Sequence, residues 1–352
     1  MISMNTSAIM AHIEKSSGLR VVRQLDHATW RGFVEQESGG NVFHTPEMFE
    51  AFVRTEGYRP SLWAAVDAER RPLALFLPVE ITLVHGPLRY LTTRAVAYGS
   101  VLCRPDERGN GALAVLLQRY SQEVKSSVLF TELRNMSDMR AVQRVLVNRG
   151  FTFQEHLNFL IDLTCPPKEI WTGIRPNARR NIRKAERLKV RVREAKDMAD
   201  IDTAYGVLRQ AYKHLRVPLP PASLFRSTFE ILGPLGMMRV LLATVDGATV
   251  GALTLLLHKG VALYWYTGML RQHSAYRPAD LLVWRSLELA RELGCQTFDF
   301  GGGGTPHKDY GVRDFKAKFG GDLVNFGRNT HIHAPVRFKL GQAGYRAWRG
   351  VP

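Results

Sequence analysis

A strongly basic stretch is the first part of the sequence whose residue types could do chemistry. Residues 175–193 include nine Lys and Arg side chains against one acid, Glu186. On a helix, Arg179, Arg183 and Arg187 would share one face because they are spaced by four. Such a stripe suits phosphate groups, those of RNA or the diphosphate of a precursor. A solvated basic helix face is the alternative interpretation.

A carboxylate, Asp299, ends an apolar strand, where α/β proteins commonly place functional side chains. It could orient an attacking amine or accept its proton, or it could stabilise the turn of the glycine run that follows. That run, Gly301–Lys308, lacks the Gly-Lys-Ser/Thr sequence of a P-loop, which excludes that motif. Tyr310 and His307 flank the run and are candidates for contact with substrate.

The segment 274–280 predicts the start of a helix, since Pro278 suits the first helical position. Backbone N–H groups at that start could hold an anion, and Arg277 would add a positive charge. Asp280 lies in the first turn and could cap the helix instead.

Alternation along the preceding strand sends Tyr264 and Tyr266 to one face, which could line an acceptor cleft or pack in the core. His331 and His333 alternate in the same way. No third ligand lies near them in the sequence, so we expect no metal site. We also find no nucleophile elbow and no Ser-His-Asp triad.

The composition favours a globular protein with polyanionic partners. The chain has 352 residues, of which 48 are Lys or Arg and 32 are Asp or Glu, giving a net charge of +16. This balance favours RNA, nucleotide diphosphates or an anionic membrane surface, and an Arg-rich genomic composition is the alternative explanation. A DNA partner is not expected.

Neither a membrane span nor an export signal is expected. No stretch approaches the roughly 20 apolar residues that cross a bilayer, and His12, Glu14 and Lys15 lie where a signal peptide would be apolar. The three cysteines form no Cys-x-x-Cys pair, which argues against disulfides and zinc. We therefore expect a cytoplasmic protein.

The elements that would position these residues occur twice. Two apolar strands joined by a turn at an Asp are predicted over residues 62–79 and again over 241–256. A helix and a further strand follow each hairpin, at residues 112–133 and 279–300. Because the two sets lie about 170 to 180 residues apart, we predict an α/β fold with two tandem domains, each a mixed sheet flanked by helices.

Two prolines place the predicted boundary. Pro166 and Pro167 end the strand at 159–163 and begin a helix. We therefore predict an N-terminal domain over 20–165 and a C-terminal domain over 166–334. Residues 335–352 form a basic, aromatic tail that could be a short surface helix.

Two motifs of the second half resemble the Fem-like branch of the GNAT superfamily. Ile174-Arg-Pro-Asn-Ala-Arg-Arg-Asn-Ile-Arg-Lys-Ala-Glu186 is similar to the family's basic helix, R-x-x-I-R-K-A. Phe298-Asp-Phe-Gly-Gly302 and Gly311-Val-Arg-Asp-Phe-Lys-Ala-Lys-Phe-Gly-Gly321 resemble its D-F-G-G and G-x-x-x-F-K-x-x-F-G-G ending. In the first half, Phe43–Phe49 fits the element F-x-T-P-x-x-F/W, and Tyr98–Val101 fits a small-residue strand.

The resemblance implies two GNAT-type domains and acyl transfer to an amine. In the second domain, strands 250–257 and 261–268 would splay around the donor and helix 279–293 would face a pyrophosphate. The glycines of the GNAT phosphate loop are missing, and Arg271–Pro278 stands in their place. That departure suits a branch that uses aminoacyl-tRNA and weakens an acetyl-CoA assignment. No permanently bound cofactor is implied.

The resemblance also implies the catalytic residue. Lys316 follows Phe315 at the position whose charge would steady the donor and the tetrahedral intermediate. Phe315 is a candidate for contact with the donor, or it packs the segment against the sheet. Arg313 could pair with a phosphate, or it could be a surface arginine.

Three functions compete. The first is a Fem-like aminoacyl or acyl transferase acting on a cell-wall or polysaccharide precursor, with tRNA and the inner membrane surface as candidate partners. The second is an acyl-CoA-dependent N-acyltransferase of polysaccharide or lipid tailoring. The third is a non-catalytic RNA- or membrane-binding protein on a GNAT scaffold, which the charge of +16 would suit.

Overall fold

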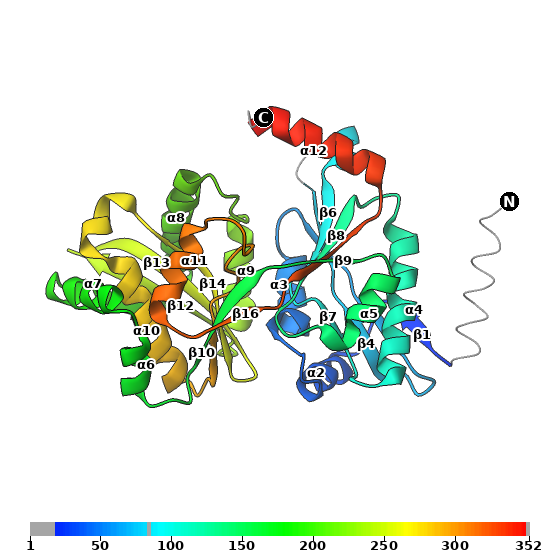
Figure 1. The fold of residues 1–352 in the computed structure, drawn as a ribbon, viewed down its shortest axis with the longest axis horizontal. Helices are drawn as coiled ribbons and strands as arrows, with labels where there is room; N and C mark the ends of the chain where they lie inside the picture. Colours follow the sequence, from blue (N-terminus) through cyan, green and yellow to red (C-terminus); the bar gives the residue numbers. More distant parts are fainter. Residues whose placement is uncertain (1–17, 83–85, 350–352) are drawn as a thin grey trace. The chain divides into compact units, whose positions relative to one another are not determined.

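The computed structural model describes residues 18–82 and 86–349. The chain forms two compact units, each with its own sheet system and core (Figure 1). Of the described residues, the first unit contains 18–53, those within 57–154, and 327–349. The second contains Arg54–Glu56 and Glu155–Phe326.

The second unit is built on a single seven-stranded sheet, in which all neighbours are antiparallel except β14 and β15. Two-residue turns with positive φ at both residues, Asp246-Gly247 and Lys259-Gly260, join its longest strands, and this turn geometry matches the twist of a hairpin. The strand order is β11 (Arg191–Glu194), β12 (Met238–Val245), β13 (Ala248–His258), β14 (Val261–Met269), β15 (Thr297–Asp299), β10 (Leu157–Asp162) and β16 (Asp322–Asn325).

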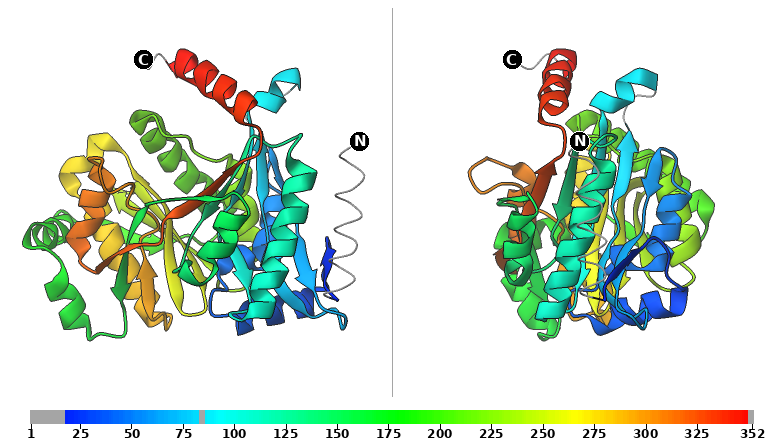
Figure 2. Two further views of the ribbon diagram at one scale, coloured as in Figure 1. Left: turned by 45° about the vertical axis from the view of Figure 1, so that its right-hand side comes forward. Right: turned by 90° about the vertical axis from the view of Figure 1, so that its right-hand side faces the viewer.

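Helices cover both faces of this sheet (Figure 2). On one face, a Cβ at Gly251 would meet Leu282 of α10; on the other, a Cβ at Gly268 would meet Ala211 of α8, so both helices lie close to the strands. The helices of this unit are α6 (Pro167–Gly173), α7 (Pro176–Arg187), α8 (Met198–Leu215), α9 (Ala222–Leu232), α10 (Pro278–Glu292) and α11 (Gly311–Lys316), with 3₁₀ turns η3 (Arg271–Tyr276) and η4 (Ala317–Phe319).

The first unit has the same plan divided into two sheets. One has the order β1 (Arg20–Val22), β3 (Trp63–Val66), β4 (Pro72–Phe76), β7 (Val101–Cys103). The other has the order β2 (Tyr58–Pro60), β5 (Val79–Thr82), β6 (Thr93–Ala97), β8 (Phe130–Arg134), β17 (Arg328–Ile332), β9 (Thr152–Gln154). Its helices are α2 (His27–Gln36), α3 (Pro46–Val53), α4 (Glu107–Val124), α5 (Arg140–Asn148) and α12 (Pro335–Arg349), with 3₁₀ turns η1 (Val42–His44) and η2 (Gly86–Leu91).

The predicted duplication is confirmed. In each unit one parallel pair of strands is joined through a helix: β6, α4 and β8 in the first, and β14, α10 and β15 in the second. Antiparallel strands flank that pair on both sides, so the two sheet systems have matching order. The chain is therefore two α/β domains of one type, as the repeated hairpin–helix–strand pattern predicted.

Strand pairing corrects the predicted domain ranges. β10 pairs with β15 and β16, so it belongs to the second unit, although it precedes the predicted boundary at 165. β17 pairs with β8 and β9, so it returns to the first unit from within the range predicted as the second. The two ranges consequently meet at 154/155 and 326/327. The tail forms helix α12, and residues 350–352 lie outside the described residues.

The histidine pair at the end of β17, His331 within the strand and His333 just after it, makes the first unit sensitive to acid. The rings of His331 and His333 lie 4.3 Å apart between centroids, and His333 Nε2 lies 2.7 Å from Thr131 Oγ1. Burial lowers the pKa of His331, and burial together with the charge of His331 lowers the pKa of His333 to about 3. Between about pH 6.5 and 3 the unfolded chain binds protons that the native pair excludes. The free energy of unfolding therefore falls as the pH falls through this window.

We expect the substitution His333→Gln to reduce that acid sensitivity by about 1–3 kcal/mol, because glutamine does not titrate and still reaches Thr131. Urea unfolding at pH 7.5 and pH 5 measures it. The exposed His27 provides the matched control, His27→Gln. Equal acid sensitivity in both variants would contradict the assignment.

Candidate functional site

The candidate site lies where β14 and β15 separate. The two strands pair only at Val261–Leu263 with Thr297–Asp299, and β14 continues to Met269 without β15 beside it. The prediction had placed the splay between strands 250–257 and 261–268. These strands instead pair continuously, from Gly251 with Met269 to His258 with Val261. Separated parallel strands present backbone amides to an extended ligand, and the separation lies one strand further along the sheet than predicted.

A glycine loop follows β15 into this separation. Gly301, Gly302 and Gly304 all have positive φ, at 60°, 76° and 75°, a conformation that favours glycine. A Cβ at Gly301 would lie 3.1 Å from the Tyr264 carbonyl oxygen of β14. Glycine at 301 therefore meets two requirements, the conformation and the close approach to β14.

Two buried side chains hold the loop from below. The Asp299 carboxylate is 2% exposed, and its Oδ1 accepts hydrogen bonds from Asn158 Nδ2 and from the Gly301 backbone N–H, both at 2.6 Å. Asn158 Oδ1 accepts from the Gly302 N–H at 3.1 Å. Burial raises the pKa of Asp299, while these donors and the charge of Lys316 oppose that rise. Of the two predicted roles for Asp299, the geometry supports the one in the turn.

Lys316 holds the same loop from the other side. The side chain is 5% exposed, and Nζ donates to the carbonyls of Phe300, Gly301 and Gly302 at 2.6, 2.9 and 2.8 Å. An ammonium has three donors, so all of them are engaged within the loop. Burial lowers the pKa of Lys316 to about 8, and the charge of Asp299 opposes this. The geometry therefore supports a positioning role for Lys316, in place of the predicted direct contact with the oxyanion.

We call Asn158, Asp299 and Lys316 the loop clamp. Together they bind the loop through its N–H groups and its carbonyls, so the backbone beside β14 is fixed by buried groups that water does not reach. A backbone fixed in this way is preorganised, which is the property that lets backbone groups stabilise a transition state.

Arg313 and Tyr310 lie at the outer end of the loop. Arg313 donates to the carbonyls of Thr305 and Lys308, at 2.7 Å each, which is a loop contact and not a phosphate contact. Tyr310 is 41% exposed. Its ring packs on Gly304, since a Cβ on that glycine would lie only 2.9 Å from the ring. Tyr310 therefore remains a candidate for substrate contact.

The alternation predicted for the tyrosines of β14 is broken by a bulge. Thr254 pairs with Tyr266 and Leu255 with Tyr264, which leaves Trp265 as the extra residue. Tyr264 is consequently buried in the core, with Lys316 Nζ 5.4 Å from its ring centroid. Tyr266 packs on Phe225 of α9 instead. The two tyrosines thus do not line one cleft.

Phe315 packs against the sheet, the second of the two roles predicted for it. Its ring lies 5.3 Å from that of Phe319, which is buried beside Phe300. These rings hold α11 against the sheet and so position Lys316.

A buried carboxylate, Asp280, lies in the first turn of α10, and its hydrogen bond joins α10 to α7. Arg277 has a φ of 60° and Pro278 follows at the first helical position, so this turn lacks one N–H. Asp280 is 6% exposed and accepts from Asn181 Nδ2 of α7 at 3.1 Å. Burial raises the pKa of Asp280, and the charges of Lys318 and Arg277 oppose this. A pyrophosphate at this helix start would lie near a buried acid. The predicted positive charge, Arg277, is exposed beside it.

The first part of the basic stretch forms helix α7, as predicted, and its last residues begin strand β11. Its apolar residues Ala178, Ile182 and Ala185 face the core, whereas Arg183 is exposed and lies 5.5 Å from the Trp171 ring centroid. Arg179 is half-buried on the same helix. Neither arginine contacts the loop clamp, so any role they have concerns a distal part of a ligand.

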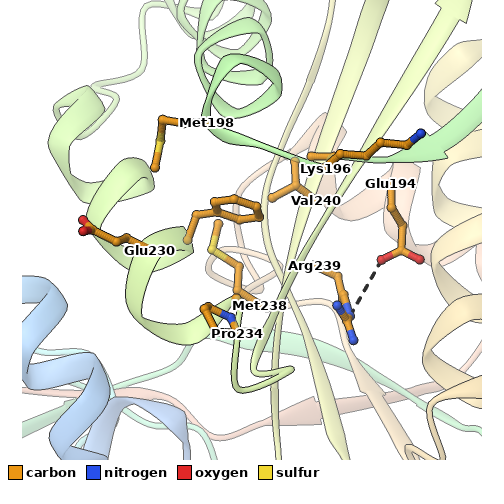
Figure 3. Close-up of a pocket in the computed structure, with 11 residues that line it drawn as sticks. Glu194, Lys196, Met198, Glu230, Pro234, Met238, Arg239 and Val240 are labelled. Atoms are coloured by element: carbon orange, nitrogen blue, oxygen red, sulfur yellow. Dashed lines mark ion pairs between the residues drawn. The ribbon is translucent and has the colours of Figure 1, made fainter.

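A cavity of about 370 Å³ lies beside β11 and β12 (Figure 3). It is lined by the start of β12, including Met238 and Arg239, and Arg239 lies 3.7 Å from Glu194. None of the predicted site residues lines it. The cavity is therefore separate from the loop clamp.

Asn158 is the member of the clamp that sequence reasoning missed. It was hidden because the strand 159–163 had been placed in the first domain. The available signal was a polar residue inside the apolar run Leu157–Ile161. In the fold, Asn158 is only 7% exposed.

The described part of the chain holds neither a metal-binding cluster nor a membrane span. Over residues 18–82 and 86–349, no three His, Cys, Asp or Glu side chains gather to hold a metal ion. Over the same residues, no helix is long and apolar enough to cross a bilayer.

Comparison with known proteins agrees with the fold. Residues 173–309 match the family described as an acetyltransferase (GNAT) domain. No curated protein matches the sequence. Among solved structures, the chain resembles FemX with a TM-score of 0.71 and 13% identity, over 91% of this chain and 99% of that chain.

Two further structures share the fold. L-PGS from Bacillus licheniformis has a TM-score of 0.57 and 12% identity, over 90% of this chain and 96% of that chain. A tandem GNAT protein from the clavulanic acid biosynthesis pathway has a TM-score of 0.54 and 12% identity, over 90% and 99%. At these identities the likeness establishes the fold: the chain has the tandem fold seen in FemX, and its residues 173–309 match an acetyltransferase (GNAT) domain.

Proposed function

We propose that this tandem GNAT protein with a Fem-like fold transfers an aminoacyl or acyl group to an amine of a cell-envelope precursor in the cytoplasm. The observation that carries the proposal is the loop clamp, which lies beneath the separation of β14 and β15 within the GNAT domain. The likeness to FemX and to L-PGS supports a cell-envelope acceptor.

The chemistry needs alignment more than it needs a nucleophile. An aminoacyl ester or a thioester is already activated, so an amine held beside it at the separated strands can attack the carbonyl carbon directly. The new amide C–N bond forms as the ester C–O or thioester C–S bond breaks, and the donor leaves as its free hydroxyl or thiol. The clamp residues keep the loop rigid during that attack. Since both Asp299 and Lys316 are engaged by the loop, the proton of the amine leaves to water or to a hydroxyl of the donor.

Aminoacyl-tRNA is the donor that we favour. The start of α10, where the pyrophosphate of a CoA donor would bind, lacks the N–H of Pro278 and has the buried Asp280 carboxylate in its first turn, so it suits a pyrophosphate poorly. The exposed basic face of α7 offers a surface for the phosphates of a tRNA. An acyl-CoA donor is the second candidate, and the family description of residues 173–309 as an acetyltransferase domain favours it.

Binding to charged tRNA, uncharged tRNA and acetyl-CoA in parallel at fixed salt tests the proposal. We expect charged tRNA to bind more tightly than uncharged tRNA. Binding of acetyl-CoA with no preference between the two tRNAs would support the acyl-CoA-dependent function instead. Salt-sensitive binding of all RNA, whether or not it is aminoacylated, would indicate a non-catalytic scaffold.

The double substitution Arg179→Gln, Arg183→Gln tests the α7 surface. We expect the plot of log affinity for tRNA against log salt to become less steep, its slope decreasing in magnitude by about 2. About one phosphate contact is lost per arginine. The control Arg119→Gln, Arg144→Gln removes the same charge from exposed helix positions of the first unit. If both variants change the slope equally, tRNA responds to net charge and α7 is not its site.

A further inference from the structure

Helix α12 presents an apolar stripe away from the unit that holds it. Val336 is 74% exposed and Leu340 is 59% exposed, and Ala343 is exposed as well. These residues are spaced by four and three, so they share one face of the helix. Phe338 lies on the opposite face and packs on Phe130 with ring centroids 5.3 Å apart. The stripe therefore has no role in the core of its own unit.

The position of α12 is fixed by polar contacts at its inner side. Arg337 donates to the backbone carbonyls of Ser126 and Lys125, both at 2.8 Å. A Cβ on Gly341 would lie 2.6 Å from the Leu91 carbonyl oxygen, so the helix approaches η2 as closely as glycine allows. Figures 1 and 2 show α12 extending past the ends of the strands in its unit.

Positive charge borders the stripe. Lys339 is exposed on α12, and Arg89 is exposed on η2, where it donates to the Tyr90 hydroxyl at 2.9 Å. The hydrogen bond and charge of Arg89, with the charge of Arg337, lower the pKa of Tyr90, which is 43% exposed. The sequence has no Asp or Glu from residue 81 to 105, nor from residue 323 to the last residue. Both segments are thus free of acids.

We propose that α12 and η2 form a docking surface for an anionic lipid bilayer. A stripe of aliphatic side chains with cations beside it is the pattern of a helix that lies in the interface of a membrane. Nucleic acid would match the cations but offers no apolar region to Val336 and Leu340. The bilayer surface offers both, with acyl chains beneath the stripe and lipid phosphates beside Lys339 and Arg89. This surface does not depend on the acyl-transfer chemistry.

Sedimentation of the full chain with vesicles tests the surface. We expect binding to vesicles of equal phosphatidylglycerol and phosphatidylcholine, and little binding to phosphatidylcholine alone. Val336→Asp, Leu340→Asp should weaken binding by at least about tenfold, since a charge at each position opposes insertion. The control Leu215→Asp, Val217→Asp changes side chains that are 60% and 49% exposed in the second unit and should bind as the parent does.

A second variant separates insertion from simple attraction of charge. Arg89→Gln, Lys339→Gln should weaken binding to the anionic vesicles by about fivefold for each cation removed. The proposal is overturned if the parent chain ignores anionic vesicles. It is equally overturned if Val336→Asp, Leu340→Asp leaves vesicle binding unchanged. Loss of RNA affinity in the α12 and η2 variants, with no vesicle binding by the parent chain, would also overturn it.

Discussion

The substitution Lys316→Met is expected to lower the free energy of unfolding of the second unit by about 2–4 kcal/mol, and acyl transfer by at least about a hundredfold. Methionine retains much of the volume but donates to none of the three loop carbonyls that Nζ now binds. The buried Asp299 also loses its nearby positive charge. Urea unfolding measures stability, and the transfer rate with the proposed donor measures activity.

Measuring both stability and transfer rate in Lys316→Met distinguishes a positioning lysine from a catalytic one. If Lys316 only stabilised the oxyanion, Lys316→Met would abolish transfer while stability and the loop stayed as they are. A clamp predicts that hydrogen exchange of residues 300–304 also becomes faster. Lys318→Met is the matched control, because the Lys318 ammonium lies over the Phe315 ring, 5.7 Å from its centroid, and not at the loop carbonyls. Unchanged exchange in Lys316→Met would refute the clamp.

Short-range patterns predicted most of the fold. The turn at Asp246, the helix ending at Glu292 and the basic helix α7 all follow from local residue types. The spacing of those patterns was enough to predict the duplication. Such elements depend on neighbours in sequence, and therefore a single sequence contains their signal.

Long-range pairing could not be predicted in the same way. β10 and β17 each follow a strand of one unit and join the sheet of the other, and an apolar strand looks the same in either sheet. One extra residue at Trp265 reversed the predicted face of Tyr264. The direction of the Lys316 ammonium also depended on where the carbonyls of a loop 14 to 16 residues away would lie.

Asn158→Ala is the change that tests this long-range part of the site. Asn158 belongs to β10 and reaches 141 residues along the chain to Asp299. Alanine removes the donor to Asp299 and the acceptor for the Gly302 N–H. We expect a loss of about 1–3 kcal/mol in the free energy of unfolding and of about a hundredfold in transfer rate.

Asn158→Asp provides the sharper comparison. Aspartate restores an acceptor for Gly302 but brings a second carboxylate within hydrogen-bond distance of Asp299, where one of the two must hold a proton. Transfer by Asn158→Asp should therefore recover as the pH is lowered, whereas Asn158→Ala should stay impaired at every pH. Asn148 is exposed at the end of α5 in the first unit, so Asn148→Ala should match the parent. A pH-independent defect in both Asn158 variants would mean that the side chain only fills space, and the clamp would then reduce to Asp299 and Lys316.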